Sequence, residues 1–291
     1  MEYLFYWHFF VVSNMEGENI FRSFRFSVSH IPTFFLIVGY PIYWLELYVL
    51  RTPFGRTSWL AWAIFGFISV LILVLRLAGW RKFFVESKTW WEAQGILQKG
   101  FVVFVCLLLL GMLLIGAAAA LLPPHLIQES DSLNYHITIP RQHLILGSFA
   151  HLPWSVADFY SLPLDFAMAP YCLSTPWPNK LAFYFFIIGI LGLSWQLAWR
   201  ISKKNVWACI AVIMAILGAH GLSIQIGIAM FDVLLLYLFL AAVDSAMTGN
   251  WFLAVVEFTF YFWSKSFIPI QVCVLGVALG IIFLIAKRIK W

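Results

Sequence analysis

The sequence predicts an all-α protein that crosses a membrane about eight times. The composition is the first reason, because 63% of the residues are hydrophobic and only 11% are charged. A soluble domain carries about 25% charged residues. The second reason is a series of long apolar runs, since a backbone in lipid must satisfy its own hydrogen bonds and therefore forms helices. The third is that basic residues occur in short clusters between these runs.

The mean hydropathy of +0.91 excludes a soluble enzyme. The net charge of +5 is not typical of a nucleic-acid-binding protein, because the basic residues do not gather on one face. Membrane lipids are therefore expected partners, and nucleic acid is not.

Each apolar run is expected to form one span, for which about 17–25 residues are needed. Residues 1–100 are expected to hold N-terminal accessory helices and, at 80–99, a cytoplasmic interfacial helix. Residues 101–291 are expected to form the transmembrane core, with its longest connection at 123–180. The expected spans are 32–50, 58–79, 101–122, 181–199, 206–221, 231–246, 251–264 and 267–286.

Three basic clusters orient these spans. They lie at 81–99, 200–204 and 287–290, and eight alternating spans place all three on one face. The positive-inside rule makes that face cytoplasmic, so the loop 123–180 is expected on the non-cytoplasmic side. Arg51 and Arg56 would also lie outside and count against this orientation. Within the loop, the stretches 137–149 and 165–173 are expected to be short helices along the membrane surface.

Two acids follow the third apolar run, where a lipid headgroup would lie. Glu129 and Asp131 have a spacing that lets both carboxylates meet one cation, and Mg²⁺ or Mn²⁺ prefers such oxygen ligands. One of the acids could instead act as a general base toward an acceptor hydroxyl. The alternative is that both are solvated and that Asp131 caps a short helix.

Histidines and aromatic residues fill the loop that follows. His136, His143 and His151 recur at intervals of seven and eight residues, as on one helix face. Pro140 interrupts that helix, so these histidines are expected mainly as interfacial side chains. Trp154 could stack on a sugar ring or could belong to the aromatic belt of the membrane.

Three ionisable residues lie in or beside the later apolar runs. Asp232 begins one run, Glu257 lies in the middle of the next, and Lys265 closes it. Such residues are costly in a membrane and are usually paired or functional. Lys265 could pair with either acid in a structural contact, or it could hold a phosphate.

The segment DSLNYHITIPRQHLILGSFAHLPWSVADFYSLPLDF, residues 131–166, resembles the first outer loop of bacterial GT-C-fold glycosyltransferases. That family includes protein mannosyltransferases and lipid A aminoarabinose transferases. There, a helix leads into an Asp, a Tyr-His pair, a Pro-basic pair and a Leu-Pro-Trp sequence, and a Lys, an Asp and a second Lys flank later helices. The matching positions are Asp131, Tyr135, His136, Pro140, Arg141, Leu152, Pro153, Trp154, Lys180, Asp232 and Lys265.

The resemblance implies a bacterial inner-membrane enzyme that transfers a sugar from a polyprenyl-phosphate donor to a hydroxyl of a lipid, glycan or protein. It implies Asp131 as catalytic base or metal ligand, Glu129 as its companion, and Mg²⁺ or Mn²⁺ as a cofactor. The substrate-binding residues that it implies are Tyr135, His136, Arg141, Trp154, Lys180, Asp232 and Lys265.

The resemblance covers the N-terminal portion of the family, which usually has more spans. A partner chain is therefore expected to supply the missing C-terminal spans. Two other functions remain open. One is a non-catalytic or truncated subunit of an envelope-assembly complex. The other is a small transporter in which Asp232, Glu257 and Lys265 form a charge relay.

Overall fold

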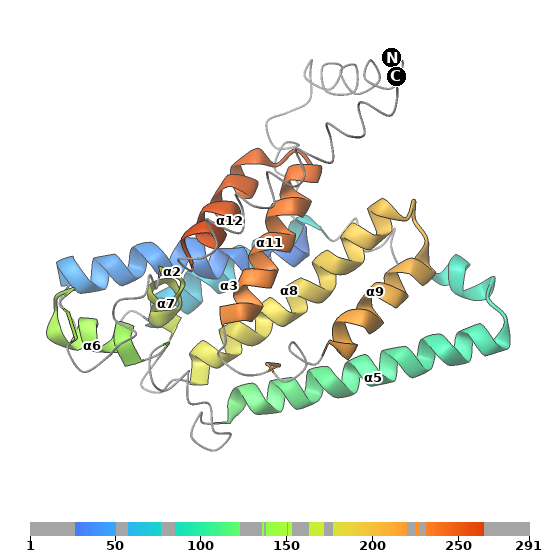
Figure 1. Ribbon diagram of the computed structural model, residues 1–291, viewed down its shortest axis with the longest axis horizontal. Helices are drawn as coiled ribbons and strands as arrows, with labels where there is room; N and C mark the ends of the chain where they lie inside the picture. The colour runs from blue at the N-terminus through green and yellow to red at the C-terminus, as the bar shows by residue number, and fades with distance from the viewer. Residues whose placement is uncertain are drawn as a thin grey trace, which may run out of the picture.

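The computed structural model describes residues 27–50, 58–76, 85, 87–122, 136, 138–149, 151–152, 163–171, 177–219, 225–226 and 231–264. Every regular element within these residues is helical, which confirms the all-α prediction. Figure 1 shows the arrangement. The elements are η2 (Val28–His30), α2 (Thr33–Leu45), η3 (Glu46–Leu50), α3 (Ser58–Leu75), α5 (Ile96–Leu121), α6 (Thr138–Leu146), α7 (Pro163–Met168), η7 (Ala169–Tyr171), α8 (Trp177–Ile201), α9 (Val206–Gly218), α11 (Phe231–Met247) and α12 (Trp251–Trp263).

The chain is a membrane protein. Four segments among the described residues are long and apolar enough to cross a bilayer, namely Val28–Leu50, Ser58–Leu75, Ile96–Leu121 and Lys180–Ile201. Three further expected spans are shorter helices: α9 and α12 have 13 residues each, and α11 has 17. At about 1.5 Å of rise per residue, α9 and α12 are shorter than the hydrocarbon core is thick. The expected span 267–286 lies outside the described residues.

Tight turns join α8 to α9 and α11 to α12. Lys203 and Lys204 adopt positive φ angles of 53° and 71° in the first turn, and Gly249 adopts 75° in the second. An asparagine then starts each following helix: the side chains of Asn205 and Asn250 accept hydrogen bonds from backbone N–H groups in the first turns of α9 and α12. Two helical hairpins result (Figure 1).

The core is built around an aromatic cluster on α2. Phe35 is fully buried and stacks on Phe65 of α3, with their ring centroids 3.6 Å apart. Tyr171 packs edge-on against Phe35 and donates a 2.9 Å hydrogen bond to its carbonyl oxygen. Burial raises the pKa of the Tyr171 hydroxyl, so this group stays a neutral donor. Trp62 of α3 in turn donates to the carbonyl oxygen of Tyr171. Although α2 falls within the region expected to be accessory, it lies at the centre of this core.

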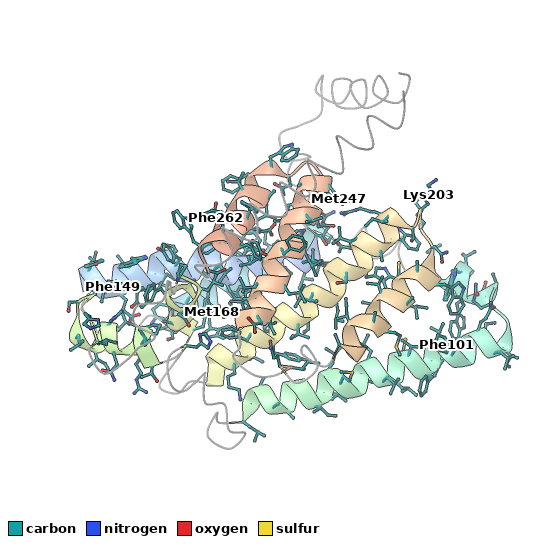
Figure 2. The ribbon with its side chains drawn as sticks, viewed as in Figure 1. Phe101, Phe149, Met168, Lys203, Met247 and Phe262 are labelled. Atoms are coloured by element: carbon teal, nitrogen blue, oxygen red, sulfur yellow. The ribbon has the colours of Figure 1, made fainter. Side chains whose placement is uncertain are left out.

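The loop helices α6 and α7 pack against the C-terminal half of α2 (Figure 2, near Phe149 and Met168). Tyr43 of α2 stacks on Phe166 of α7 with ring centroids 5.0 Å apart. Gly39 allows α7 to come close, because a Cβ there would lie 1.9 Å from the carbonyl oxygen of Ala167. The two short helices expected within 137–149 and 165–173 are therefore present. The side chains of Leu164–Met168 are buried in the protein, and the position of this helix along the membrane surface stays a prediction.

Candidate functional site

Polar side chains gather at two ends of the helix bundle. The loop end is where α5 ends at Leu121 and where α8 and α11 begin; the turn end is where the α8–α9 and α11–α12 turns lie (Figure 1). Among the residues expected to bind substrate, the structure describes His136, Arg141, Lys180 and Asp232. The others lie outside the described residues, namely Glu129, Asp131, Tyr135, Trp154 and Lys265.

At the loop end, His136 is held by a carboxylate that the sequence analysis did not single out. Nδ1 of His136 lies 2.8 Å from Oδ1 of Asp165, and the two side chains are 9% and 2% exposed. A neutral imidazole that donates its Nδ1 hydrogen to this carboxylate has Nε2 as its acceptor nitrogen. The ring is thus held in the orientation that a base or a hydrogen-bonding group in a site requires. The sequence does indicate that a helix starts here, since Pro163 and Asp165 are typical of the first turn of a helix.

Lys180 is fully buried at the start of α8. Its ammonium group donates hydrogen bonds of 2.9 Å and 2.7 Å to the carbonyl oxygens of Ala119 and Leu122. The last carbonyl groups of a helix have no partner within the helix and carry partial negative charge, so a lysine suits this position. The structure therefore gives Lys180 a capping role on α5, and its expected role in binding a phosphate stays a prediction.

The other two described residues that were predicted to bind substrate lie on the surface of the protein. Arg141 is exposed on α6, and Asp232 is exposed in the first turn of α11, at the same end of the bundle as Lys180. His143 is only 1% exposed and packs against the ring of Phe149 at 4.6 Å. His143 is thus a packed side chain of the protein interior, and its position at the membrane interface stays a prediction. The three loop histidines do not share one helix. Of His136, His143 and His151, only His143 lies in α6.

At the turn end, four charged side chains form a cluster that links η2, α8, α11 and α12. We call it the charge cluster; its members are His30, Arg200, Asp244 and Glu257. Nδ1 of His30 lies 2.9 Å from Oε1 of Glu257, and Nε2 lies 3.0 Å from Oδ2 of Asp244. Arg200 donates to Oδ1 of Asp244. Both carboxylates are at most 1% exposed.

The geometry determines the charge of the cluster. Two hydrogen bonds from one imidazole ring need two hydrogens shared between the ring and the carboxylates. Either His30 is an imidazolium between two carboxylates, or it is neutral beside one protonated carboxyl group. The histidine and the two acids then carry one net negative charge in both cases, and Arg200 balances it. A buried cluster without net charge is the form that apolar surroundings tolerate.

Hydroxyl groups satisfy the remaining oxygens of Glu257. Thr33 donates to Oε1 at 2.7 Å, and Ser245 donates to Oε2 at 2.8 Å. The Tyr237 hydroxyl lies 2.8 Å from the Thr33 hydroxyl and accepts a hydrogen bond from the Thr33 backbone N–H. Each carboxylate oxygen of Glu257 thus has at least one donor, which offsets part of the cost of burying the acid.

Glu257 stands out in the sequence as an acid within an apolar run, but its partners do not. The transporter alternative places Asp232 and Glu257 in one relay, yet Glu257 contacts Ser245 near the opposite end of α11. Twelve residues separate Asp232 from Asp244, which is about 18 Å along the helix axis at 1.5 Å per residue. A direct relay between Asp232 and Glu257 is therefore wrong. An acid in a membrane helix usually has a partner, and His30, at the head of the first apolar run, was a candidate that the sequence offered beside Lys265.

Among the described residues, no group of three or more His, Cys, Asp or Glu side chains could hold a metal ion. The expected cation ligands, Glu129 and Asp131, lie outside those residues. Comparison of the chain with protein-family models, with curated proteins and with solved structures finds no match.

Proposed function

We propose that this protein is a membrane glycosyltransferase that moves a sugar from a polyprenyl-phosphate donor to a hydroxyl acceptor at the loop end. The contact between His136 and Asp165 is the observation that supports this proposal most. The two residues lie near opposite ends of the segment 131–166, which carries the resemblance to GT-C enzymes. Their contact joins His136 to α7, which packs on α2. Asp131 would then lie within a few residues of an oriented imidazole.

In the proposed reaction, Asp131 accepts the proton of the acceptor hydroxyl as its oxygen attacks the anomeric carbon. The bond between that carbon and the phosphate oxygen breaks, and the donor leaves as polyprenyl phosphate. His136, held by Asp165, hydrogen-bonds the sugar or the acceptor. Lys265 offsets the charge of the departing phosphate. Mg²⁺ or Mn²⁺ bound by Glu129 and Asp131 would supply further positive charge there.

The proposal includes a topology of about eight spans with the loop 123–180 on the non-cytoplasmic side of a bacterial inner membrane. The exposed Lys203 and Lys204 lie at the turn end, which the positive-inside rule assigns to the cytoplasm. The antiparallel pair of α5 and α8 connects at the loop end, as this topology requires. A partner chain with the further spans of the GT-C family belongs to the same proposal.

The test is the release of polyprenyl phosphate by purified protein in liposomes, using a panel of polyprenyl-phosphate hexoses and pentoses with added Mg²⁺ or Mn²⁺. The wild-type protein is expected to release polyprenyl phosphate from at least one donor, and Asp131→Asn is expected to abolish release. Glu92→Gln is the matched control, because Glu92 is an acid whose side chain is 64% exposed. Full release by Asp131→Asn in correctly inserted protein would refute the assignment.

The charge cluster favours a second candidate function, a small proton-coupled transporter. A histidine between two buried acids can hold or pass a proton, and such groups in membrane helices mark proton paths. In this case, solute uptake would fail in Glu257→Gln and would persist in Asp131→Asn. An inactive chain that gains transferase activity only with a partner chain would point instead to a subunit of an envelope-assembly complex.

A further inference from the structure

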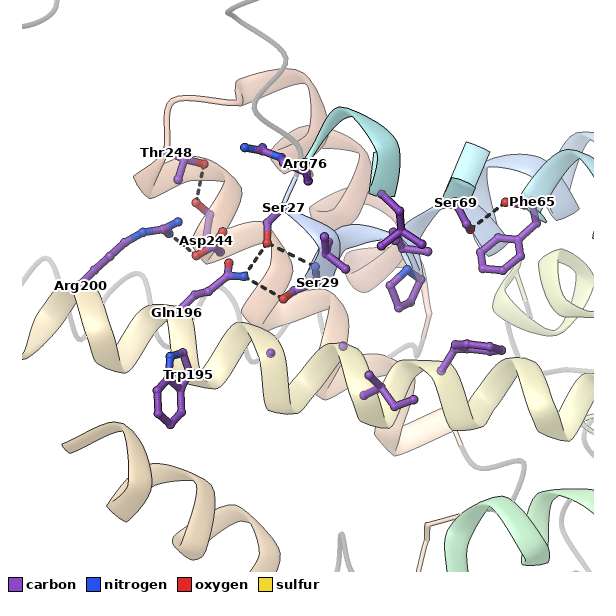
Figure 3. Close-up of a pocket in the computed structure, with 18 residues that line it drawn as sticks. Ser27, Ser29, Phe65, Ser69, Arg76, Trp195, Gln196, Arg200, Asp244 and Thr248 are labelled. Atoms are coloured by element: carbon purple, nitrogen blue, oxygen red, sulfur yellow. Dashed lines mark hydrogen bonds and ion pairs between the residues drawn. The ribbon is translucent and has the colours of Figure 1, made fainter. Parts of the chain in front are cut away.

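A large cavity lies between α3 and α8 at the turn end, and the segment that forms η2 lines it as well (Figure 3). Its volume is about 1120 Å³, which exceeds the range of about 300–1,000 Å³ that is usual for small-molecule sites. Leu73 of α3 and Ile188 of α8 line the cavity and are 39% and 43% exposed. Both belong to segments that are long and apolar enough to cross a bilayer, so the cavity opens toward the membrane.

The lining of the cavity changes from apolar to polar along α8. Phe185 and Ile188 of α8 and Phe65 of α3 supply apolar side chains. Gln196 lies eleven residues after Phe185, about 16 Å further along the helix axis at 1.5 Å per residue, and it lines the polar end (Figure 3). This direction is that of a lipid in one leaflet, because its chains lie in the span and its polar part lies at the helix ends.

The polar end is built by the close approach of the first described residues to α8. Gly192 allows this approach, because a Cβ there would lie 2.3 Å from the hydroxyl oxygen of Ser29. Nε2 of Gln196 then donates hydrogen bonds to the hydroxyl oxygens of both Ser27 and Ser29. The oxygen of Ser27 also accepts the backbone N–H of Ser29 and so caps η2. Both serine side chains are thus held by hydrogen bonds that their oxygens accept.

Four hydroxyl side chains line the cavity among the described residues, and they differ in where their hydrogens go. Ser69 and Thr248 donate to backbone carbonyl oxygens three or four residues earlier in the chain. A hydroxyl group has two lone pairs and one hydrogen, and Ser27 uses both lone pairs for N–H donors. The hydrogens of Ser27 and Ser29 have no acceptor among the described residues, so the polar end offers two donors to an occupant.

The occupant must therefore combine oxygen acceptors with a long apolar part. Ester carbonyl oxygens of a lipid are such acceptors, and they lie where the acyl chains join the headgroup. An uncommitted hydroxyl donor gains a hydrogen bond from such an oxygen when water is excluded. This recognition uses neutral groups, and it needs no charge on the headgroup.

We propose that this cavity binds an ester lipid of the surrounding bilayer through its ester carbonyl groups. Ser27 and Ser29 donate hydrogen bonds to the carbonyl oxygens, and one acyl chain lies along Phe185 and Ile188. Gln196 is a positioning residue, because it holds both serine oxygens and leaves their hydrogens to the lipid. The proposal does not depend on the proposed transferase activity, which concerns the opposite end of the bundle.

The test is native mass spectrometry of the full chain in neutral detergent, with phosphatidylcholine in its diester form and in a diether form with equal chains. The two lipids have the same headgroup and charge, and only the diester has carbonyl oxygens. We expect the diester to bind about tenfold more tightly, because two neutral hydrogen bonds are lost with the diether. Equal binding of the two lipids would overturn the proposed recognition.

Three variants test the residues of the polar end. The double variant Ser27→Ala/Ser29→Ala is expected to bind the diester as weakly as the diether. Ser69→Ala is the matched control and should bind like the wild-type protein, because Ser69 lines the same cavity but donates to the carbonyl oxygen of Phe65. Gln196→Glu should also lose the preference for the diester, because a carboxylate only accepts and would take both serine hydrogens.

Two results would overturn the assignment of these residues. One is an unchanged preference for the diester in the folded double variant, and the other is an unchanged preference in folded Gln196→Glu. Tighter binding of an isoprenoid quinone than of the diester would assign the cavity to a different class of ligand.

Discussion

Replacing Glu257 by alanine tests whether the charge cluster holds the bundle together. The side chain is fully buried and accepts hydrogen bonds from His30, Thr33 and Ser245. The replacement removes all three contacts and leaves the buried groups that made them without a partner in apolar surroundings. Because two of the donors come from η2 and α2, we expect the N-terminal segment to loosen from α12 first.

The expected loss of unfolding free energy is about 3–5 kcal/mol, which is the cost of removing one partner of a buried ion pair. Three hydrogen bonds to a charged acceptor, at about 1.5–3 kcal/mol each, would sum to more. The smaller figure applies because the freed donors can find other partners and because such terms are not additive. Folded proteins are stable by only about 5–15 kcal/mol, so the variant should unfold at much lower denaturant.

The assay is SDS-induced unfolding in mixed micelles, followed by far-ultraviolet circular dichroism. A double-mutant cycle of Glu257→Ala with His30→Ala isolates the pair, and we expect a coupling of about 2–3 kcal/mol. An ordinary hydrogen bond between membrane helices averages about 0.6 kcal/mol in such cycles. Glu92→Ala is the control, since its exposed pair with Lys88 is worth about 0.3–0.5 kcal/mol. A coupling at or below the value of an ordinary hydrogen bond would refute the charge cluster as a stabilising unit.

Two further predictions concern packing and capping. Gly39→Ala should destabilise the protein by about 1–3 kcal/mol, because the added Cβ would force α2 and α7 apart; Gly66→Ala, with nothing within 4 Å of the added atom, should be neutral or slightly stabilising in the same unfolding assay. Lys180→Met should cost about 2–3 kcal/mol, because two carbonyl groups at the end of α5 lose a charged donor. Unchanged stability of Lys180→Met, together with lost binding of a polyprenyl-phosphate sugar, would show that the lysine serves the substrate instead.

The sequence allowed the helices to be predicted because each of them depends on local apolar character. The expected spans 58–79 and 181–199 correspond to α3 and α8 within a few residues. Helix length was harder to predict: the runs beginning at 206 and 251 form helices of 13 residues, which asparagine caps and tight turns delimit. Apolar composition alone does not mark such ends, since the same residues would also continue a longer helix.

The candidate sites could be predicted only in part, because their partners are far apart in sequence. His30 and Glu257 are separated by 227 positions, and His136 and Asp165 by 29. Hydrophobic periodicity places a residue on a helix face, but it does not say which helices are neighbours. Glu257 was recognisable as an unusual acid in an apolar run, whereas Asp165 lay in a loop where acids are ordinary. Its importance follows from its burial, which only the tertiary structure shows.

The hydrogen bond from Lys180 to the carbonyl oxygen of Leu122 also determines how the loop between them can vary. The two ends of the loop 123–180 therefore lie together, while α6 and α7 between them pack back onto α2. Lengthening such a loop costs little, about 0.6 kcal/mol for each doubling of its length. Outside α6 and α7, whose side chains belong to the core, the loop can therefore diverge in length and composition between related chains while α5 and α8 keep the same register.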